Sequence, residues 1–270
     1  MKFEGVRLRV SNKAATDDEF MQIPSSKSVE VTFDVAHTHD LSEGGQYDIT
    51  MKGALRYAKD ESNKLVGSVP LRSSTVQATV NGAKRSTTIG SLLRRTTFQS
   101  DCTGATLQAV TDASNNCVSL AQKASEVASS GPASKMEEFF KDSSSQVRQQ
   151  VASVLDKVVA ECPNNGGASR TYCTDVGGYC GGRTLAYTVP SQSYIVYCDL
   201  YYNDLPPLTS SCHQQDQATT NLHETTHLSE VAGTDDLGYG YDAIRQLSTQ
   251  DSLNNADSYA VFANSIYAGC

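Results

Sequence analysis

Two histidines and a glutamate lie together in the sequence HETTH, as His223, Glu224 and His227. The surrounding residues 215–228, QDQATTNLHETTHL, have the spacing of an amphipathic helix, on which positions four apart share one face. Two imidazole nitrogens on one helical face can bind the same zinc ion, and the glutamate beside them can reach a water at the metal. The motif therefore predicts a zinc site in which Glu224 acts as the general base.

A catalytic zinc site needs a third protein ligand and an open coordination position. No histidine follows His227 and no glutamate follows Glu230, so a later histidine or a later helical glutamate is excluded as that ligand. A turn at residues 233–234 could bring Asp235 or Asp236 to the histidines, whereas Asp257 would need its helix to pack alongside. The third ligand is thus expected among the downstream aspartates, which are Asp235, Asp236, Asp242, Asp251 and Asp257.

The cysteines point to an oxidising compartment. All eight lie after residue 101, are dispersed, and include no CxxC pair, which is typical of a disulfide framework. The first residues, MKFEGVRLRV, lack the charged head and apolar stretch of a signal peptide, and no apolar run approaches the ~18 residues of a membrane span. We expect a secreted protein whose signal peptide is absent from this sequence and which has no membrane segment.

The chain of 270 residues is 39% hydrophobic and 19% charged, which is normal for a globular protein. Its residue pattern divides it into two parts. Alternating apolar and polar residues predict strands in a small β-sandwich over residues 1–83, and helical spacing takes over from Asp101. The fold class expected is α+β: a mainly helical catalytic domain with a small hairpin sheet, preceded by the β-sandwich. The expected strands are 27–36, 46–58, 74–83, 184–190 and 193–198, and the expected helices are 103–128, 135–142, 145–162, the HETTH helix and roughly 249–267.

Charge changes at the same junction. Residues 1–95 hold 14 basic against 11 acidic side chains, and residues 96–270 hold 8 against 19. Opposite net charges favour docking of the two parts. The polar junction 84–95 contains the dibasic pairs Lys84-Arg85 and Arg94-Arg95, which a kexin-like protease would cleave in a secreted protein. Cleavage after Arg95 would release residues 96–270 with every cysteine.

The motif continues in a way that resembles a known family. HETTH is followed by GTDDLGYG at residues 233–240, and this HExxH plus GTxDxxYG pattern is similar to that of the deuterolysins, the aspzincin group of secreted fungal zinc endopeptidases. The resemblance extends through DQATT, LNNADSYA and six of the cysteines, so it covers residues 96–270, and the basic front part resembles the family's propeptide. It implies a zincin-like fold, one zinc ion per chain and proteolysis of polypeptides, with a preference for basic proteins such as histones and protamines.

The resemblance also implies roles for single residues. It makes Asp236 the third metal ligand and Asp257 a carboxylate that orients a histidine, with Asp257 kept as the alternative ligand. Tyr239 becomes the first candidate for stabilising the oxyanion, and Tyr201 is the second. The disulfides implied are Cys102–Cys173, Cys180–Cys198 and Cys212–Cys270; a fourth bridge between Cys117 and Cys162 is our hypothesis, because these two depart from the six-cysteine pattern.

Other interpretations remain open. A catalytically silent zinc-binding or toxin-like secreted module could use the same fold, although the intact Glu224 argues against it, and another zinc hydrolase could use the same helix. The front part has no cysteine to offer the metal, so we expect it to inhibit by blocking the cleft. No motif indicates a nucleic-acid, nucleotide, flavin or haem partner, and we expect a monomer.

Overall fold

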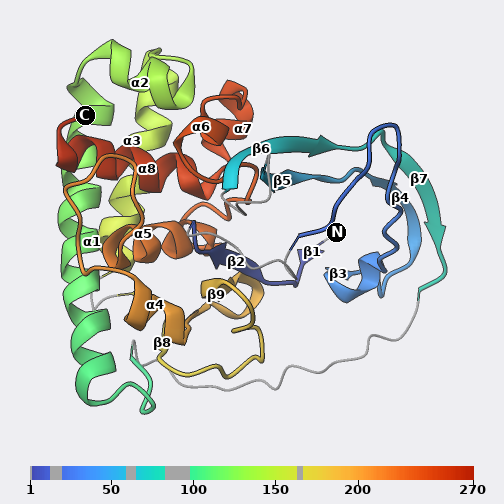
Figure 1. Ribbon diagram of the computed structural model, residues 1–270, viewed down its shortest axis with the longest axis horizontal. Coiled ribbons are helices and arrows are strands. Elements are labelled where there is room, and N and C mark those ends of the chain that lie inside the picture. Colours follow the sequence, from blue (N-terminus) through green and yellow to red (C-terminus); the bar gives the residue numbers. More distant parts are fainter. Residues whose placement is uncertain (1, 13–19, 59–64, 83–97, 163–166) are drawn as a thin grey trace.

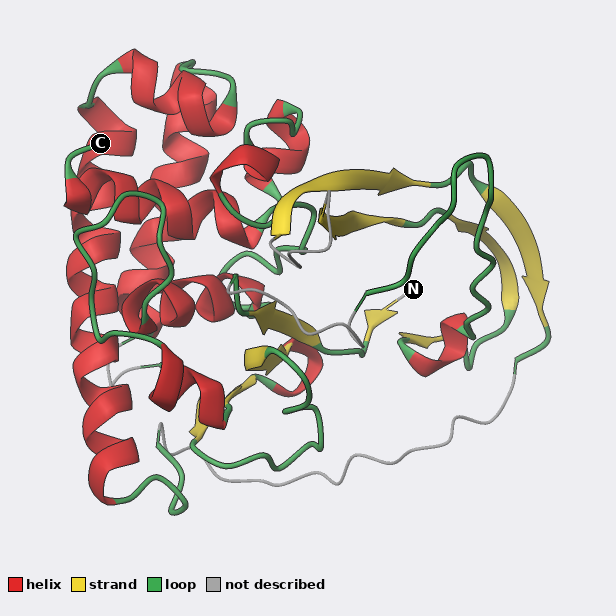
Figure 2. Ribbon diagram, in the orientation of Figure 1, coloured by secondary structure: helices red, strands yellow, loops and turns green. Residues whose placement is uncertain are grey.

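The computed structural model describes residues 2–12, 20–58, 65–82, 98–162 and 167–270. Helices fill one half of the molecule and long strands the other, as Figures 1 and 2 show. The predicted junction 84–95, with both dibasic pairs, lies outside the described residues. The helices are α1 (Gly104–Ser130), α2 (Ala133–Phe140), α3 (Ser145–Glu161), α4 (Asp199–Asp204), α5 (Gln217–His227), α6 (Tyr241–Ile244), α7 (Thr249–Leu253) and α8 (Ala256–Ala268), with short 3-10 turns η2 (Val35–His37) and η3 (Pro190–Gln192).

The helical half is built on α1, which packs against α3, α5 and α8 around one hydrophobic core. Its buried residues recur three and four positions apart, so a single face of the helix meets the core. That face carries Val110, Ala113, Cys117, Leu120, Ala121, Ala124 and Ala128. The spacing of apolar residues that predicted α1 in the sequence is therefore also the spacing of its buried residues. None of the described helices is long and apolar enough to cross a membrane.

The disulfides tie this half together. The three bridges implied by the family resemblance form, and the hypothesis of a fourth bridge is confirmed because Cys117 in α1 pairs with Cys162 at the end of α3. No described cysteine is free. The pairs are Cys102–Cys173, Cys117–Cys162, Cys180–Cys198 and Cys212–Cys270.

A four-stranded sheet lies beside the helices, with the strand order β2-β9-β10-β8. The strands β9 (Thr184–Val189) and β10 (Tyr194–Tyr197) form the predicted antiparallel hairpin, and β8 (Arg170–Tyr172) pairs with β10 in parallel. The fourth strand, β2 (Arg7–Val10), comes from the front of the chain and pairs antiparallel with β9. The front part thus contributes a strand to the sheet of the helical half (Figure 1).

The predicted β-sandwich is wrong. The remaining described strands of the front part form separate two-stranded pairs, and residues 27–34, expected to be a strand, form none. No described residue between 20 and 82 is buried, and Leu55 and Val69 are more than half exposed, so these pairs enclose no core of their own. Alternating apolar and polar residues predict strands, but they do not predict which other strands or helices will bury the apolar face. The pairs are β1 (Lys2–Phe3) with β3 (His39–Asp40), β4 (Gly45–Ile49) with β7 (Val76–Val80), and β5 (Lys52–Ala58) with β6 (Leu65–Arg72).

The last predicted helix is also corrected, because residues 249–267 form two helices, α7 and α8, separated at Asn254 and Asn255. Asn255 is fully buried and its amide group bonds to the backbone of Leu237 and Gly238 in a different segment. An asparagine side chain competes readily with the helical backbone for hydrogen bonds. The break therefore fastens the GTDDLGYG loop to the start of α8.

Candidate active site and metal centre

Helix α5 carries the HETTH sequence through the centre of the molecule. It begins after Asp216, whose side chain accepts a hydrogen bond of 2.6 Å from the backbone amide of Thr219, while the Thr219 hydroxyl accepts one of 3.1 Å from the amide of Asp216. This reciprocal pair satisfies amide groups that a helix start leaves free. All residues of α5 are buried, so both histidines project into a protected environment.

The two histidines and Asp236 meet at one point. Oδ1 of Asp236 lies 3.1 Å from Nε2 of His223 and 3.5 Å from Nε2 of His227. One ligand atom from each residue lies within 4.8 Å of the others, so the three side chains could hold one metal ion. Burial would raise the pKa of Asp236, but the two histidines hold it far below its ordinary value. The carboxylate is therefore charged and free to coordinate a cation.

The far nitrogens of the two rings have separate partners. Nδ1 of His227 lies 2.8 Å from the carbonyl oxygen of Thr234, which can only accept a hydrogen bond. Nδ1 of His223 lies 3.1 Å from Oδ1 of Asp257, whose other oxygen accepts a 2.6 Å hydrogen bond from the amide of Gly240. Such partners turn the Nε2 lone pairs toward a metal. Asp257 therefore lies behind the His223 ring, on the opposite nitrogen from Asp236.

The turn after α5 positions Asp236 through its neighbours. The amide of Asp235 donates to the carbonyl of Asn254 at 2.8 Å, and Oδ1 of Asn255 accepts from the amides of Leu237 and Gly238 at 2.8 and 3.0 Å. The backbone amides of Asp235, Leu237 and Gly238, on both sides of Asp236, are thus bonded to the α7–α8 break. Asn255 lies in the NNADSY sequence, but the sequence reasoning did not single it out.

Glu224, also on α5, interacts electrostatically with His227 and Asp236. Its Oε2 accepts a 2.6 Å hydrogen bond from the hydroxyl of Thr188 in β9, while the buried Oε1 has no hydrogen-bond partner among the described residues. Burial raises the pKa of Glu224 to about 7, although the charge of His227 and the Thr188 hydrogen bond oppose the increase. A buried carboxylate oxygen without a partner is costly unless a water or ion completes its surroundings.

This donor set fits zinc. Two imidazole nitrogens and one carboxylate oxygen are typical of catalytic zinc sites, which leave one position for water. Glu224 interacts electrostatically with His227 and Asp236, and its Oε1, which has no partner among the described residues, is free to accept a proton from that water. Thr188, which fixes the other oxygen of Glu224, was missed by the sequence reasoning because a threonine in a strand carries no distinguishing pattern.

The two tyrosines predicted to stabilise an oxyanion lie in different places. The ring of Tyr239 stacks over that of His223 with centroids 6.2 Å apart, and its hydroxyl donates to the carbonyl oxygen of Leu8 at 2.8 Å. Burial raises the pKa of Tyr239 well above its ordinary value, so the hydroxyl keeps its proton. Tyr201 contacts none of the three clustered residues: it is a fully buried residue of α4, and its hydroxyl donates to Oδ1 of Asn221 in α5 at 2.8 Å.

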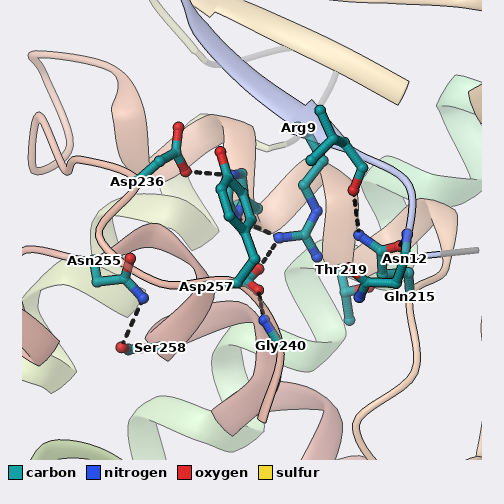
Figure 3. A network of polar contacts seen from close by, with 12 residues as sticks. Arg9, Asn12, Gln215, Thr219, Asp236, Gly240, Asn255, Asp257 and Ser258 are labelled. Carbon is teal, nitrogen blue, oxygen red and sulfur yellow. Dashed lines mark hydrogen bonds and ion pairs between the residues drawn. The ribbon is translucent and has the colours of Figure 1, made fainter. Parts of the chain in front are cut away.

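A residue of the front part enters the site. Arg9, from β2, is 1% exposed, and its Nη1 lies 2.7 Å from Nδ1 of His223 and pairs with Oδ1 of Asp257. Figure 3 shows the guanidinium reaching from the strand to Asp257, with Gly240 on the other side of the carboxylate. Burial, and then the charge of Arg9, lowers the pKa of His223 well below its ordinary value, so this ring is neutral. The alternation in VRLRV could have predicted a strand at residues 6–10, but not its place in the site.

Comparison with known proteins decides the family. The sequence model of the deuterolysin metalloprotease (M35) family matches residues 1–270. The chain belongs to the deuterolysin metalloprotease family. It is 44% identical over 271 residues to a neutral protease 2 homologue of Colletotrichum graminicola, covering 99% of this chain and 77% of the relative. It is 43% identical over 275 residues to neutral protease 2 of Aspergillus oryzae, covering 100% and 78% of the two chains.

A third relative matches almost end to end: a neutral protease 2 homologue of Aspergillus flavus is 43% identical, with 100% of this chain and 96% of the relative covered. Among solved structures, a zinc peptidase from Grifola frondosa matches 61% of this chain and 97% of its own, at a TM-score of 0.48 and 20% identity. The deuterolysin assignment makes this chain a zinc metalloprotease, as the HExxH and GTxDxxYG motifs predicted.

Proposed function

We propose that the chain is the precursor of a secreted, monomeric deuterolysin-type endopeptidase. In this proposal residues 96–270 are the catalytic domain, residues 1–83 are an inhibitory propeptide, and residues 84–95 are the linker cleaved after Arg95 by a kexin-like protease. The metal ligands are His223, His227 and Asp236. Four disulfides in the described residues support secretion, because such bridges persist in oxidising compartments.

The observation that carries the catalytic assignment is the convergence on one point of His223, His227 and Asp236, with Glu224 beside them. The sequence alone would place Glu224 near a metal. The structure adds that its buried Oε1 has no hydrogen-bond partner among the described residues and that its Oε2 accepts from Thr188. A carboxylate held by one oxygen and open at the other suits a general base that must point at a water.

The chain's own residues would divide the reaction between them. Zinc, when bound, supplies a Lewis acid that lowers the pKa of water and polarises a peptide carbonyl. Glu224 accepts a proton at Oε1 and later donates it to the leaving amine. Tyr239 donates its hydroxyl proton in a hydrogen bond to the carbonyl oxygen, where negative charge develops. Asp257 holds His223 in the orientation that the ligand role needs.

The propeptide assignment is supported by where the front part contacts the rest. Strand β2 pairs with the edge of β9, and Thr188 of β9 contacts Glu224. The carbonyl oxygen of Leu8 in β2 accepts the hydrogen bond of the Tyr239 hydroxyl. Farther along, Arg72 of β6 forms an ion pair with the nearly buried Asp251. Since none of the described residues between 20 and 82 is buried, we expect the fold of the front part to depend on these contacts.

Basic polypeptides are the proposed substrates. Residues 96–270 carry 19 acidic against 8 basic side chains, a charge that attracts cationic chains. Two arginines already occupy this region, because Arg7 pairs with Asp235 and Arg9 with Asp257. We expect the processed enzyme to cleave lysine-rich polypeptides faster than acidic ones, with an advantage that decreases as salt is added. Equal, salt-independent rates on both substrates would reject this preference.

The catalytic proposal is tested by combining metal analysis with proteolysis. We expect the processed, oxidised protein to contain one zinc per chain and to cleave a basic protein in a reaction that a chelator stops and zinc restores. Stoichiometric zinc without cleavage would favour the catalytically silent module instead. Absence of stoichiometric zinc would reject the metal centre at His223, His227 and Asp236.

A further inference from the structure

Arg9 and a zinc ion would make opposite demands on His223. A guanidinium group has only donors, so its 2.7 Å contact with Nδ1 of His223 requires that Nδ1 accept through its lone pair. A neutral imidazole has one protonated nitrogen and one nitrogen with a free lone pair. With Nδ1 accepting, the proton is on Nε2, the nitrogen that faces Asp236. His223 then has no lone pair for a metal at that position.

Asp257 imposes the other arrangement. A carboxylate only accepts hydrogen bonds, so its 3.1 Å contact with Nδ1 of His223 is a hydrogen bond only in the tautomer with the proton on Nδ1, and that tautomer leaves Nε2 free to bind a metal. Arg9 contacts both partners of this pair, since it also reaches Oδ1 of Asp257. The guanidinium therefore competes for the two atoms, Oδ1 of Asp257 and Nδ1 of His223, whose hydrogen bond to each other would leave Nε2 able to bind zinc.

Charge acts in the same direction. Arg9 is 1% exposed and lies among the carboxylates of Glu224, Asp236 and Asp257. At this depth charges are screened far less than at the surface, so a buried monovalent cation both offsets part of the negative charge of these carboxylates and repels a divalent cation nearby. Zinc would bind one nitrogen of the His223 ring, and the guanidinium contacts the other, so the two cations would lie on opposite sides of the same side chain.

We propose that Arg9 and zinc compete: seating of Arg9 between Asp257 and His223 lowers the zinc affinity of the uncleaved chain, and zinc binding loosens strand β2. This inference rests on the proposed metal centre and adds a coupling between metal loading and the propeptide. Linkage requires the two effects to be equal in size, because each ligand changes the affinity of the other by the same factor.

The strand has other anchors, so Arg9 can be replaced without removing β2. The carbonyl of Leu8 accepts from Tyr239, that of Val10 accepts from Gln215 at 3.0 Å, and that of Ser11 accepts from Arg183 at 2.7 Å. The pairing of β2 with β9 is a backbone ladder. A variant at residue 9 should thus keep the strand near the site and change only the buried cation.

The test uses the full chain with Glu224→Gln, which prevents self-cleavage, and measures zinc affinity by competition with a chelating dye. We expect Arg9→Met to bind zinc about tenfold or more tightly than the parent, in the range by which partners of ligand histidines change metal affinity. Arg72→Met is the matched control, because this propeptide arginine pairs with Asp251 and not with the cluster; it should leave zinc affinity unchanged. If Arg9→Met fails to fold, Arg9→Gln serves the same purpose.

Hydrogen exchange of the β2 amides provides the reciprocal measurement. Zinc should reduce the protection of residues 7–10 in the parent and have little effect in Arg9→Met. Equal zinc affinity in the parent and both residue-9 variants, or greater protection of β2 with zinc, would overturn the competition. His227→Ala separates the two proposals. If this variant binds zinc as tightly as the parent, the proposed metal centre is wrong. If it loses zinc while the residue-9 variants bind zinc like the parent, the metal centre stands and only the competition with Arg9 is wrong.

Discussion

The hydroxyl group of Tyr239 donates a 2.8 Å hydrogen bond to the carbonyl oxygen of Leu8, a residue that precedes it by more than two hundred positions. Its acceptor is a peptide carbonyl on a strand that runs antiparallel to β9. A group that donates to this carbonyl is suited to donate to the carbonyl of a polypeptide substrate in the same place. Burial keeps the hydroxyl protonated by raising its pKa well above the ordinary value.

We therefore expect Tyr239→Phe to lower kcat of the processed enzyme by about 10²–10³ while KM changes little, which is the loss typical when a donor to an oxyanion is removed. Steady-state kinetics on a peptide substrate measures both constants. Tyr201→Phe is the matched control, since it removes the same hydroxyl from the bond to Asn221 in the core; it should cost stability and leave kcat nearly unchanged. A Tyr239→Phe enzyme with normal kcat would remove Tyr239 from the reaction.

Glu224→Gln tests the general base. The glutamine keeps the size of the side chain and can still contact Thr188, but it cannot accept a proton, so we expect zinc to be retained and kcat to decrease by about 10² or more. Metal analysis and turnover are measured on the same preparation. Normal cleavage by this variant would contradict the mechanism.

Substitutions of Asp236 and Asp257 should lower the zinc affinity by different amounts. Oδ1 of Asp236 lies near Nε2 of both histidines, whereas Asp257 contacts only the far nitrogen of His223. We expect Asp236→Ala to lose stoichiometric zinc and Asp257→Asn to bind it about 10–100-fold more weakly. Chelator competition on the processed variants gives both values. A greater loss in Asp257→Asn than in Asp236→Ala would reverse the two roles.

The sequence was sufficient to predict that His223, His227 and a downstream aspartate would lie together, and to predict the helices α1, α2 and α3. The two histidines of HETTH share one face of a helix, and once later histidines and glutamates are excluded, an aspartate is the expected third ligand. The buried face of α1 repeats with the same spacing that predicted the helix. These features are local, because each depends on residues only a few positions apart.

The features that the sequence could not predict join distant residues. Arg9 reaches His223 across 214 positions, and Thr188 reaches Glu224 across 36. The predicted β-sandwich failed for the same reason, since alternation shows which side chains share a face but not which surface will cover them. The front part obtains its burial from β9 and α5, and no pattern within residues 1–83 specifies that partner.

The bridge between Cys117 and Cys162 should contribute substantially to stability. It joins α1 to the end of α3 and closes a loop over a sequence separation of 45. Constraining the unfolded chain over such a loop stabilises a protein by about 2–4 kcal/mol. We expect Cys117→Ala with Cys162→Ala to reduce the free energy of unfolding by that amount while zinc content stays at one per chain. Denaturant unfolding measures the first and metal analysis the second; an unchanged free energy of unfolding would show that the bridge adds nothing.

Asp175 holds the turn that leads to the Cys180–Cys198 bridge. Its side chain accepts hydrogen bonds from the amides of Gly178, Tyr179 and Cys180, at 2.8, 3.1 and 3.0 Å, and from the hydroxyl of Tyr187 at 2.8 Å. Burial alone would raise the pKa of Asp175, but the hydrogen bonds outweigh it and lower the pKa below the ordinary value. Each of these bonds favours the charged form of the carboxylate.

A carboxyl group with a lowered folded-state pKa stabilises the fold above its unfolded pKa of about 3.9, and this contribution is lost as pH decreases through the folded value. We expect Asp175→Asn to reduce the free energy of unfolding by about 1 kcal/mol at pH 7, a modest amount because the group is exposed, and the difference from the parent to decrease below about pH 4. Denaturant unfolding of both proteins at pH 7, 5 and 3 measures it. Asp112→Asn, on the exposed face of α1 with one hydrogen bond from Gln108, is the control and should show no comparable difference. A difference for Asp175→Asn that stays constant from pH 7 to pH 3 would contradict the role of its charge.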